Sequence, residues 1–546
     1  MKRKRVKMVS KKSFLFLMIL FFTACGEVNT GSGSTSTATQ TQTVTVTVSG
    51  KVTYDSVPFK SAGTSGLDYN NIIQKEVRGA VVEIVDVSGR ILGTTSTDEN
   101  GAYSLGVTGT TAKVRVSAKL IKPVSAGTSN WDFQVKDNTN GNALYVMEGS
   151  LADLGTNSTQ TRNLNAPSGW GGSSYTSTRT AAPFAILDVV YEAIQKITTA
   201  QNDADFGTLD IFWSKNNIAA SGNKNIGQIT TSHFNGVALY ILGTENSDTD
   251  EYDTAVVGHE WGHYYESQFS RSDSIGGSHG ASDMLDIRLA FGEGFGTAMG
   301  CIIIDSPLYL DSIGNVQSNT GVFENVENGG SRTNAGWYNE ASIYSILYDV
   351  YDANDDRGDT LSLGFTPMHN LFTDSQKNTE AFTSIFTFIT ALKAENPGND
   401  EAIDAITSNE SIAPIWDIYG TGRTNRRLEN ANPLYANLDV GSSVNITTNY
   451  SATANDPSRE VGAYNFVKFT IPTSGTYTLN IRQVGGSGTP DPDMFVYKGS
   501  STEPVATAEN STTTDSIRRT FSPGTYRMAV LIYNTDSGNT FNITLN

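Results

Sequence analysis

The chain has 546 residues, of which 38% are hydrophobic and 17% are charged, and it contains 52 glycines and 15 prolines. These proportions exclude a collagen and a coiled coil, and the length predicts three or four domains of about 150 residues each. The formal net charge is −18, but seven basic residues precede Cys25, so the remainder carries 31 basic and 56 acidic residues. Because so acidic a chain repels phosphate, no nucleic-acid partner is expected. Two cysteines exclude a disulfide framework.

Residues 1–24 are typical of a secretory signal. Seven basic residues lie before Ser13, and a mostly apolar run continues from there to Phe22. This run of about ten residues is too short to span a membrane core of about 30 Å. The small residues directly before Cys25 resemble the lipobox of bacterial lipoproteins, which implies that Cys25 carries a lipid; an ordinary cleaved signal is the alternative.

We therefore expect an exported protein that a lipid anchors to the bacterial cell envelope, at the outer membrane or the cell surface. No later stretch reaches the roughly 18 apolar residues of a membrane helix, so the lipid would be the only membrane anchor. Residues 25–43 are almost entirely Gly, Ser, Thr, Asn and Gln, a composition that predicts a flexible tether.

Residues 44–165 are predicted to form a small β-sandwich. Apolar and polar residues alternate over several short stretches with Gly, Asn and Asp turns between them, at residues 44–48, 79–85, 113–117 and 131–135. The stretch from Gly93 to Leu105 resembles the turn and strand of carboxypeptidase-regulatory-like domains, which are transthyretin-like sandwiches. The resemblance implies a spacer or a binding platform, and we expect no chemistry there.

Residues 175–435 are predicted to mix helices and strands in an α+β domain. Apolar residues recur at three- and four-residue steps in several stretches, at residues 181–200, 254–269, 284–305, 340–352 and 379–394. Strand candidates at residues 209–213 and 237–242 precede the second helix. The second of these is expected to be the sheet edge that pairs with an extended peptide.

Residues 436–546 return to short alternating strands, which predicts a second β-sandwich. The paired Gly-Thr-Tyr strand starts at Gly475 and Gly524 resemble the bacterial pre-peptidase C-terminal domain, a sandwich commonly appended to secreted peptidases. The whole chain is therefore expected to be multidomain, with a β-sandwich on each side of a central α+β domain.

The most informative motif is His259-Glu260-Trp261-Gly262-His263, within the helical stretch 254–269 of a chain that has five histidines. On a helix, His259 and His263 point the same way and can bind one metal ion, whereas Glu260 stands about 100° round the axis, where it can hold a water. The motif predicts a zinc site in which Glu260 is the general base. Two structural histidines on a packed helix are the alternative.

A catalytic zinc site needs a third protein ligand. The position where a metzincin has a third histidine is Phe269, whereas Glu293 lies thirty residues after His263 on the next predicted helix. Glu293 is therefore the expected third ligand. His279 is the alternative metal ligand, although its glycine-rich surroundings would hold it less firmly than a helix does.

The motif together with Glu293 resembles the thermolysin-like gluzincins over residues 237–305. The resemblance implies a zincin-type domain that hydrolyses peptide bonds, with the general base passing a proton from water to the leaving amine. In that family an Asp four residues after the third ligand orients a ligand histidine, and this position is Thr297 here. Gly292, Gly296 and Gly300 share one face of the predicted helix, which we explain by close approach to the zinc helix.

Other residues have secondary predicted roles. Asp283 and Asp286 are expected to be solvated or to bond a ligand histidine. The oxyanion of the reaction needs a donor, for which His369 is the catalytic candidate besides Tyr338 and His279.

The stretch from Asp352 to Asp359 crowds oxygen donors as a Ca²⁺ site does, but its glycine is at the seventh position and not the sixth that an EF-hand requires. A solvated acidic loop is therefore the preferred interpretation, and a Ca²⁺ site is the alternative. Cys301 is expected to be a buried apolar residue.

These observations lead to one main hypothesis: a secreted, lipid-anchored zinc endopeptidase that acts on protein or peptide substrates. A surface adhesion or binding lipoprotein with a structural or degenerate zinc site is the alternative, against which the intact Glu260 argues. A zinc hydrolase of a non-peptide amide or of a glycan-bearing protein is a third hypothesis that the sequence does not separate from the first.

Overall fold

The computed structural model describes residues 45–546 apart from 61–64, 110, 156–158, 328–332, 354–357, 359, 426–430, 449–456 and 534–537. The predicted signal, Cys25 and the tether therefore lie outside the described residues, as does most of the acidic stretch 352–359. The described part contains seven α-helices and strands arranged in five sheets. It is mostly β, with its helices gathered between residues 182 and 409. No helix in this part of the chain has the length and apolar character that crossing a membrane requires.

The N-terminal region contains a five-stranded sheet built around β1 (Thr45–Ser56). Val46, Val48, Val52 and Tyr54 of β1 are all buried, as the alternation of apolar residues predicts. The strands that pair with β1 are β2 (Ile73–Glu76), β5 (Ala102–Thr108), β11 (Thr159–Thr161) and β12 (Leu164–Ala166).

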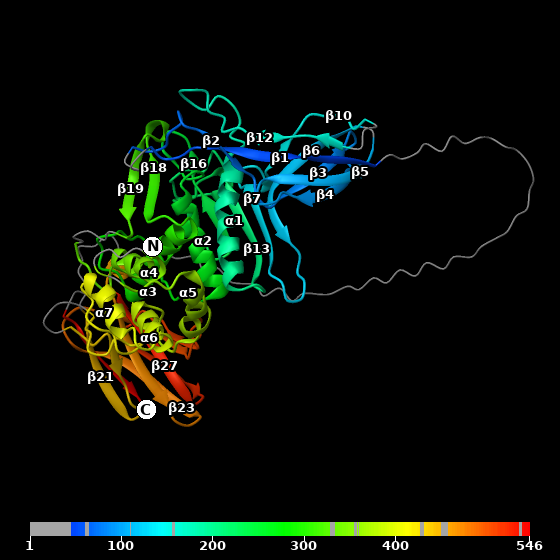
Figure 1. The fold of residues 1–546 in the computed structure, drawn as a ribbon. Helices are drawn as coiled ribbons and strands as arrows, with labels where there is room; N and C mark the ends of the chain where they lie inside the picture. Colours follow the sequence, from blue (N-terminus) through cyan, green and yellow to red (C-terminus); the bar gives the residue numbers. More distant parts are fainter. Residues whose placement is uncertain are drawn as a thin grey trace, which may run out of the picture. The chain divides into compact units, whose positions relative to one another are not determined.

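A ten-stranded sheet continues from the N-terminal region into the centre of the chain (Figure 1). β7 pairs in parallel with β13, and β13 pairs in parallel with β15, so the sheet crosses the boundary predicted between residues 165 and 175. One continuous apolar core likewise joins the two regions, since it contains both Val46 and Phe291. The strands are β3 (Ala80–Asp86), β4 (Ile91–Ser96), β6 (Thr111–Lys122), β7 (Asn130–Asp137), β8 (Ala143–Leu144), β9 (Val146–Glu148), β10 (Ala152–Asp153), β13 (Asp205–Trp213), β14 (His233–Phe234) and β15 (Ala238–Ile241).

The edge of this sheet differs from the prediction. Residues 237–242 contain β15, but the two-residue strand β14 pairs antiparallel with its outer side and is itself the last strand. The prediction that residues 237–242 form the edge was therefore wrong by one strand. No alternating pattern of useful length marks a strand of two residues, so β14 escaped sequence reasoning.

The central helices are α1 (Ala182–Ala200), α2 (Thr254–Phe269), α3 (Ile287–Ile303), α4 (Glu340–Tyr351), α5 (Phe365–Leu371), α6 (Ile385–Glu395) and α7 (Asp400–Asn409), and a π-helical turn, η4, follows α5 at Phe372–Gln376. Five of these helices, α1 to α4 and α6, lie at the predicted helical stretches, whereas α5 and α7 were not predicted. A four-stranded sheet accompanies α2 and α3, made of β16 (Gly243–Thr244), β17 (Asp248–Thr249), β18 (Leu308–Ile313) and β19 (Asn319–Asn325). Asp253, at the start of α2, accepts hydrogen bonds from the backbone and hydroxyl of Ser312, which ties α2 to β18.

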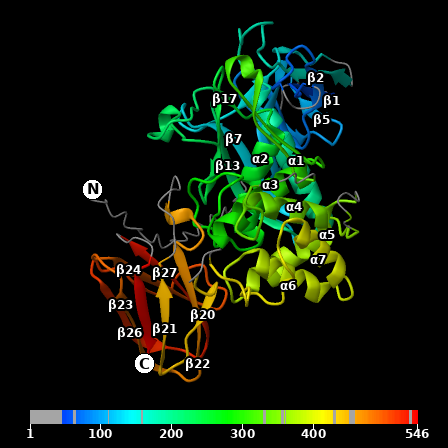
Figure 2. The same cartoon turned by 90° about the vertical axis from the view of Figure 1, so that its left-hand side faces the viewer.

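The C-terminal region has two sheets around a core of its own (Figure 2). One sheet contains β20 (Tyr435–Asn437), β22 (Tyr464–Ile471), β27 (Gly524–Tyr533), β24 (Asp491–Lys498) and β25 (Ala506–Ala508). The other contains β21 (Ser442–Thr447), β28 (Thr540–Leu545), β23 (Gly475–Gly485) and β26 (Thr514–Phe521). The predicted Gly-Thr-Tyr strand starts open β23 and β27, so the predicted strand pattern is confirmed here.

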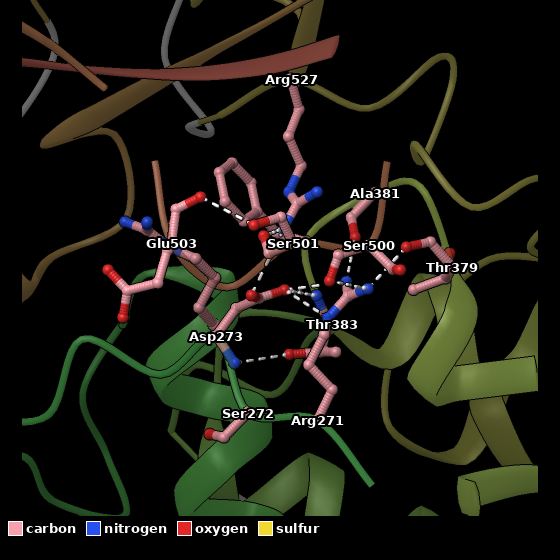
Figure 3. A network of polar contacts seen from close by, with 12 residues as sticks. Arg271, Ser272, Asp273, Thr379, Ala381, Thr383, Ser500, Ser501, Glu503 and Arg527 are labelled. Carbon is pink, nitrogen blue, oxygen red and sulfur yellow. Dashed lines mark hydrogen bonds and ion pairs between the residues drawn. The ribbon is translucent and has the colours of Figure 1, made fainter. Parts of the chain in front are cut away.

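A buried polar network joins this C-terminal region to the segment that follows α2 (Figure 3). Asp273 binds Arg271 at 2.9 Å and lies 3.5 Å from Arg527 of β27. The two guanidinium groups also donate to backbone carbonyls, Arg271 to Thr379 at 2.6 Å and Arg527 to Ser501 at 2.7 Å. Because all three charged side chains are at most 4% exposed, the network depends on their mutual neutralisation.

We predict that Asp273→Ala destabilises the fold by about 3 kcal/mol, because it leaves two buried guanidinium groups with no carboxylate. The melting temperature of the purified chain, compared with that of the exposed control Asp400→Ala, measures the effect. An equal melting temperature for both variants would contradict the importance of this network.

Candidate metal centre

Helix α2 brings the two motif histidines together on one side. His259 and His263 are one turn apart, and their Nε2 atoms are 3.0 Å from each other. His259 is 7% exposed and Glu260 is 8% exposed, so the motif lies in the protein interior at the wall of a cavity. One ligand atom from each of His259, Glu260 and His263 lies within 4.8 Å of the others.

Helix α3 brings Glu293 to the same point. Its Oε2 atom lies 3.5 Å from Nε2 of His259 and 3.4 Å from Nε2 of His263. Zinc bonds of about 2.0–2.1 Å in a tetrahedral arrangement place ligand atoms about 3.3 Å apart. The donor set and its spacing therefore fit a zinc ion held by two imidazoles and one carboxylate.

The charges of the site are strongly coupled. Burial alone would raise the pKa of Glu293, but the neighbouring histidines hold that pKa well below its ordinary value. Burial alone would lower the pKa of His263, but Glu293 and Glu260 raise it to about 9. The carboxylates thus favour a positive charge at the point where the side chains meet. Either protons or a metal ion can supply that charge.

Glycines allow α3 to approach α2 closely. A Cβ atom on Gly296 would lie 2.9 Å from Nε2 of His259, and one on Gly300 would lie 2.5 Å from the carbonyl oxygen of Ala255. The predicted reason for these glycines is confirmed at both positions. Gly292 instead faces Ser274. A Cβ atom on Gly292 would lie 3.0 Å from the Cβ atom of Ser274.

Thr297 contacts and orients His259, the first candidate ligand. Its hydroxyl is 3.1 Å from Nδ1 of His259, which leaves the Nε2 atom of that ring directed at Glu293. Thr297 occupies the position where the resembling family has an aspartate. A neutral hydroxyl fixes the ring without adding a further negative charge.

Glu260 lies beside the ligand set and is held by the edge strand of the large sheet. Its Oε2 atom accepts a hydrogen bond of 2.8 Å from the backbone N–H of Phe234 in β14. This bond leaves Oε1 available to a water or substrate atom. The position suits a general base.

His279 also reaches the centre, although it lies in the loop between α2 and α3. Its Nε2 atom is 3.3 Å from Oε2 of Glu293 and 3.7 Å from Oε2 of Glu340. Nδ1 of His279 lies 3.0 Å from the carbonyl oxygen of Gly277, to which it can donate, so Nε2 is free to act as a ligand or as a proton donor towards the cavity.

Two buried carboxylates near the centre escaped the sequence reasoning. Glu340 begins α4, and burial raises its pKa to about 7. Glu266 is one turn after His263 on α2 and is 2% exposed, and burial raises its pKa to about 7. A three-residue step from His263 was available as a signal for Glu266, whereas nothing in the sequence marked Glu340.

The structure does not bring His369 to the centre. This side chain is 1% exposed, with Nδ1 2.9 Å from the hydroxyl of Tyr265 and Nε2 3.1 Å from Oε1 of Gln201. It is not part of the cavity lining, so its predicted catalytic role is corrected to a structural one. Burial lowers the pKa of His369 to about 4.

Other predicted residues also lie elsewhere. Tyr338 is buried and does not line the cavity. Asp286 caps α3 and pairs with Arg288 at 2.8 Å, and Asp283 lies outside the lining. Cys301 is fully buried, and burial raises the pKa of its thiol above the ordinary range, as expected of an inert apolar residue.

The cavity at the centre has a volume of about 1000 Å³, enough for several peptide residues. Four of the five histidines of the chain line it, as do Glu260, Glu293 and the edge strand β14. Most of the histidines, together with Glu260 and Glu293, are thus concentrated at this one cavity.

No protein-family model matches the chain, and no curated protein matches it. Solved structures match it only in part. The pre-peptidase C-terminal domain of a collagenase from Bacillus anthracis is 11% identical, with 22% of this chain and 99% of that chain covered and a TM-score of 0.17.

A surface-associated copper-binding protein, CorA, from Methylomicrobium album BG8 is 12% identical, with 20% of this chain and 97% of that chain covered and a TM-score of 0.16. A family 35 carbohydrate binding module from Clostridium thermocellum is 16% identical, with 19% of this chain and 94% of that chain covered and a TM-score of 0.13. Each of these structures matches only a limited part of the chain, and nothing about the activity of the chain follows from them.

We predict that Gly296→Ala weakens zinc binding by about 10–100-fold, because the added methyl group displaces His259 from its position. Zinc titration with a competing chelator measures the affinity. Gly292→Ala, whose methyl group would meet a serine side chain, is the matched control. Equal zinc affinities in both variants would contradict the role assigned to the contact of Gly296.

We predict that His369→Gln leaves zinc content and hydrolysis unchanged but lowers stability by about 1–3 kcal/mol through its lost buried hydrogen bonds. Because the pKa of His369 in the folded chain is about 4, below its unfolded value of about 6.5, its contribution is complete above pH 6.5 and is lost as the pH falls towards 4. Melting temperatures from pH 4 to 7 should therefore vary less in the variant. A loss of hydrolysis at unchanged stability would restore the catalytic hypothesis.

Proposed function

We propose that the chain is a zinc-dependent peptidase of the gluzincin type. The observation that carries this proposal is the convergence of Nε2 of His259, Nε2 of His263 and Oε2 of Glu293 within 3.0–3.5 Å at the wall of a cavity, with Glu260 beside them. A purely structural zinc site is closed by four protein ligands and has no use for an adjacent base. The arrangement here instead has a base and an accessible cavity.

His259, His263 and Glu293 would hold the zinc ion. A zinc ion bound there supplies positive charge that polarises a substrate carbonyl and makes a water acidic near neutral pH. Glu260 takes the proton of the attacking water and delivers it to the leaving amine, since its free oxygen faces the cavity while Phe234 fixes the other. His279 is the candidate donor to the developing oxyanion, because it lines the same cavity as the proposed zinc ligands.

An extended polypeptide is the substrate class that fits the cavity best. β14 lines the cavity and is the last strand of its sheet; because Glu260 takes the backbone N–H of Phe234, a peptide would pair with the remaining backbone groups of this edge. Backbone pairing positions a chain with little dependence on side chains, as an endopeptidase requires. We infer from the signal-like N-terminus and Cys25 that this activity is exported and anchored by a lipid to the cell envelope.

We predict that Glu260→Gln keeps about one zinc per chain but loses about 10²–10⁴-fold in kcat on quenched fluorescent casein, because the amide cannot accept the proton. Glu293→Ala should lose zinc as well as activity. Glu395→Gln, on α6 and outside the cavity lining, is the matched control and should keep both. Full hydrolysis by Glu260→Gln would contradict the proposed mechanism, and a wild-type chain that binds no zinc would contradict the proposed function.

A further inference from the structure

Three carboxylates on the wall of the same cavity converge on a second point. Asp248 lies in β17, Asp250 directly follows that strand, and Asp311 lies in β18. One carboxylate oxygen from each lies within 4.8 Å of the others. Asp248 pairs with Ile313 across the two strands, and continuing this antiparallel register places Asp250 beside Asp311.

These carboxylates are buried without matching donors. Asp250 is 3% exposed, and the Oδ1 atoms of Asp248, Asp250 and Asp311 are all buried and have no hydrogen-bond partner among the described residues. The other oxygen of Asp250 accepts a hydrogen bond from the hydroxyl of Ser232. No lysine or arginine in the described part of the chain forms an ion pair with any of the three.

Nearby groups do not relieve this repulsion. Asp253, three residues after Asp250, is fully buried, and its carboxylate accepts hydrogen bonds from Ser312, so it supplies no donor to the three aspartates. Like charges on directly opposed strand residues destabilise a sheet. Buried charges are normally paired with an opposite charge or coordinate a metal ion.

We propose that Asp248, Asp250 and Asp311 bind a hard divalent cation of the calcium type, separate from the zinc centre. Calcium takes six to eight oxygen ligands at about 2.3–2.6 Å, so ligand oxygens across the ion lie up to about 5 Å apart. The observed limit of 4.8 Å between the carboxylate oxygens is consistent with this spacing. The donor set contains only oxygen, whereas zinc prefers the imidazoles of the first centre.

The cation would support the wall of the active-site cavity. Tyr309 precedes Asp311 by two residues on β18, so both side chains lie on the same face of the strand, and both line the cavity. The ring of Tyr309 packs edge-on against the ring of His259, with 6.0 Å between centroids. An ion that fixes Asp311 therefore also fixes the strand that carries this contact to a zinc ligand.

Calcium titration by calorimetry tests this proposal on the whole chain with zinc present, in wild type, Asp250→Asn and Asp311→Asn. Asp400→Asn, an exposed residue in the first turn of α7, is the matched control. We expect wild type and Asp400→Asn to bind one calcium ion more than the two cavity variants, or to bind it at least about tenfold more tightly.

Melting temperatures give a second readout that separates cation binding from a structural role. Calcium should raise the melting temperature of wild type and Asp400→Asn, and should change it little in the two cavity variants. Without calcium, Asp250→Asn should be as stable as wild type or more stable, because it removes a repelling charge. Zinc content should be the same in all four chains, so failure of this proposal is distinguishable from failure of the zinc centre.

Two results would overturn the proposal. One is a wild-type chain that neither binds calcium nor melts at a higher temperature in its presence. The other is calcium binding that remains unchanged in both Asp250→Asn and Asp311→Asn, which would place any calcium site elsewhere. In the first case, a changed KM of the two cavity variants for lysine- or arginine-containing peptides would favour a pocket for a basic side chain.

Discussion

The contact between α2 and α3 is the constraint on which the rest of the site depends. Two imidazoles on one helix supply only part of a metal site, and Glu293 reaches them because Gly296 and Gly300 let the backbones of the two helices approach. Each glycine inside a helix costs about 1 kcal/mol relative to alanine. The close approach that they permit explains why the helix retains them.

The approach of the helices also concentrates negative charge. Glu260, Glu266, Glu293 and Glu340 all lie within or near the centre, and three aspartates share the cavity wall. Lys224 is the one lysine or arginine among the described residues that line the cavity, so the carboxylates suit it to cations and not to anions. The strongly acidic composition of the chain thus has a local counterpart at the site.

The sequence allowed good prediction of features that are local in the chain. The bounds of α2 follow from one helical pattern, and the motif places His259, Glu260 and His263 by helix geometry alone. Glu293 was also predicted, because a third candidate ligand on the next helix can be identified by its residue type and its distance along the chain. The alternating strands of the C-terminal region follow from the same local reasoning.

Features that depend on contacts between distant segments could not be predicted in this way. The parallel pairing of β7 with β13, the cluster of Asp248 with Asp311 and the network around Asp273 join residues between 60 and 260 positions apart, for which one sequence gives no signal. His369 was selected by its chemical type, but its burial against Tyr265 depends on packing.

X-ray absorption at the zinc edge tests the central claim most directly. For the zinc-loaded chain the account predicts a first shell of nitrogen and oxygen ligands at about 2.0–2.1 Å, with the scattering signature of at least two imidazoles. That signature should survive Glu260→Gln and be lost together with the bound zinc in Glu293→Ala. A shell of oxygen ligands without imidazole would contradict the account, because zinc would then lie away from His259 and His263.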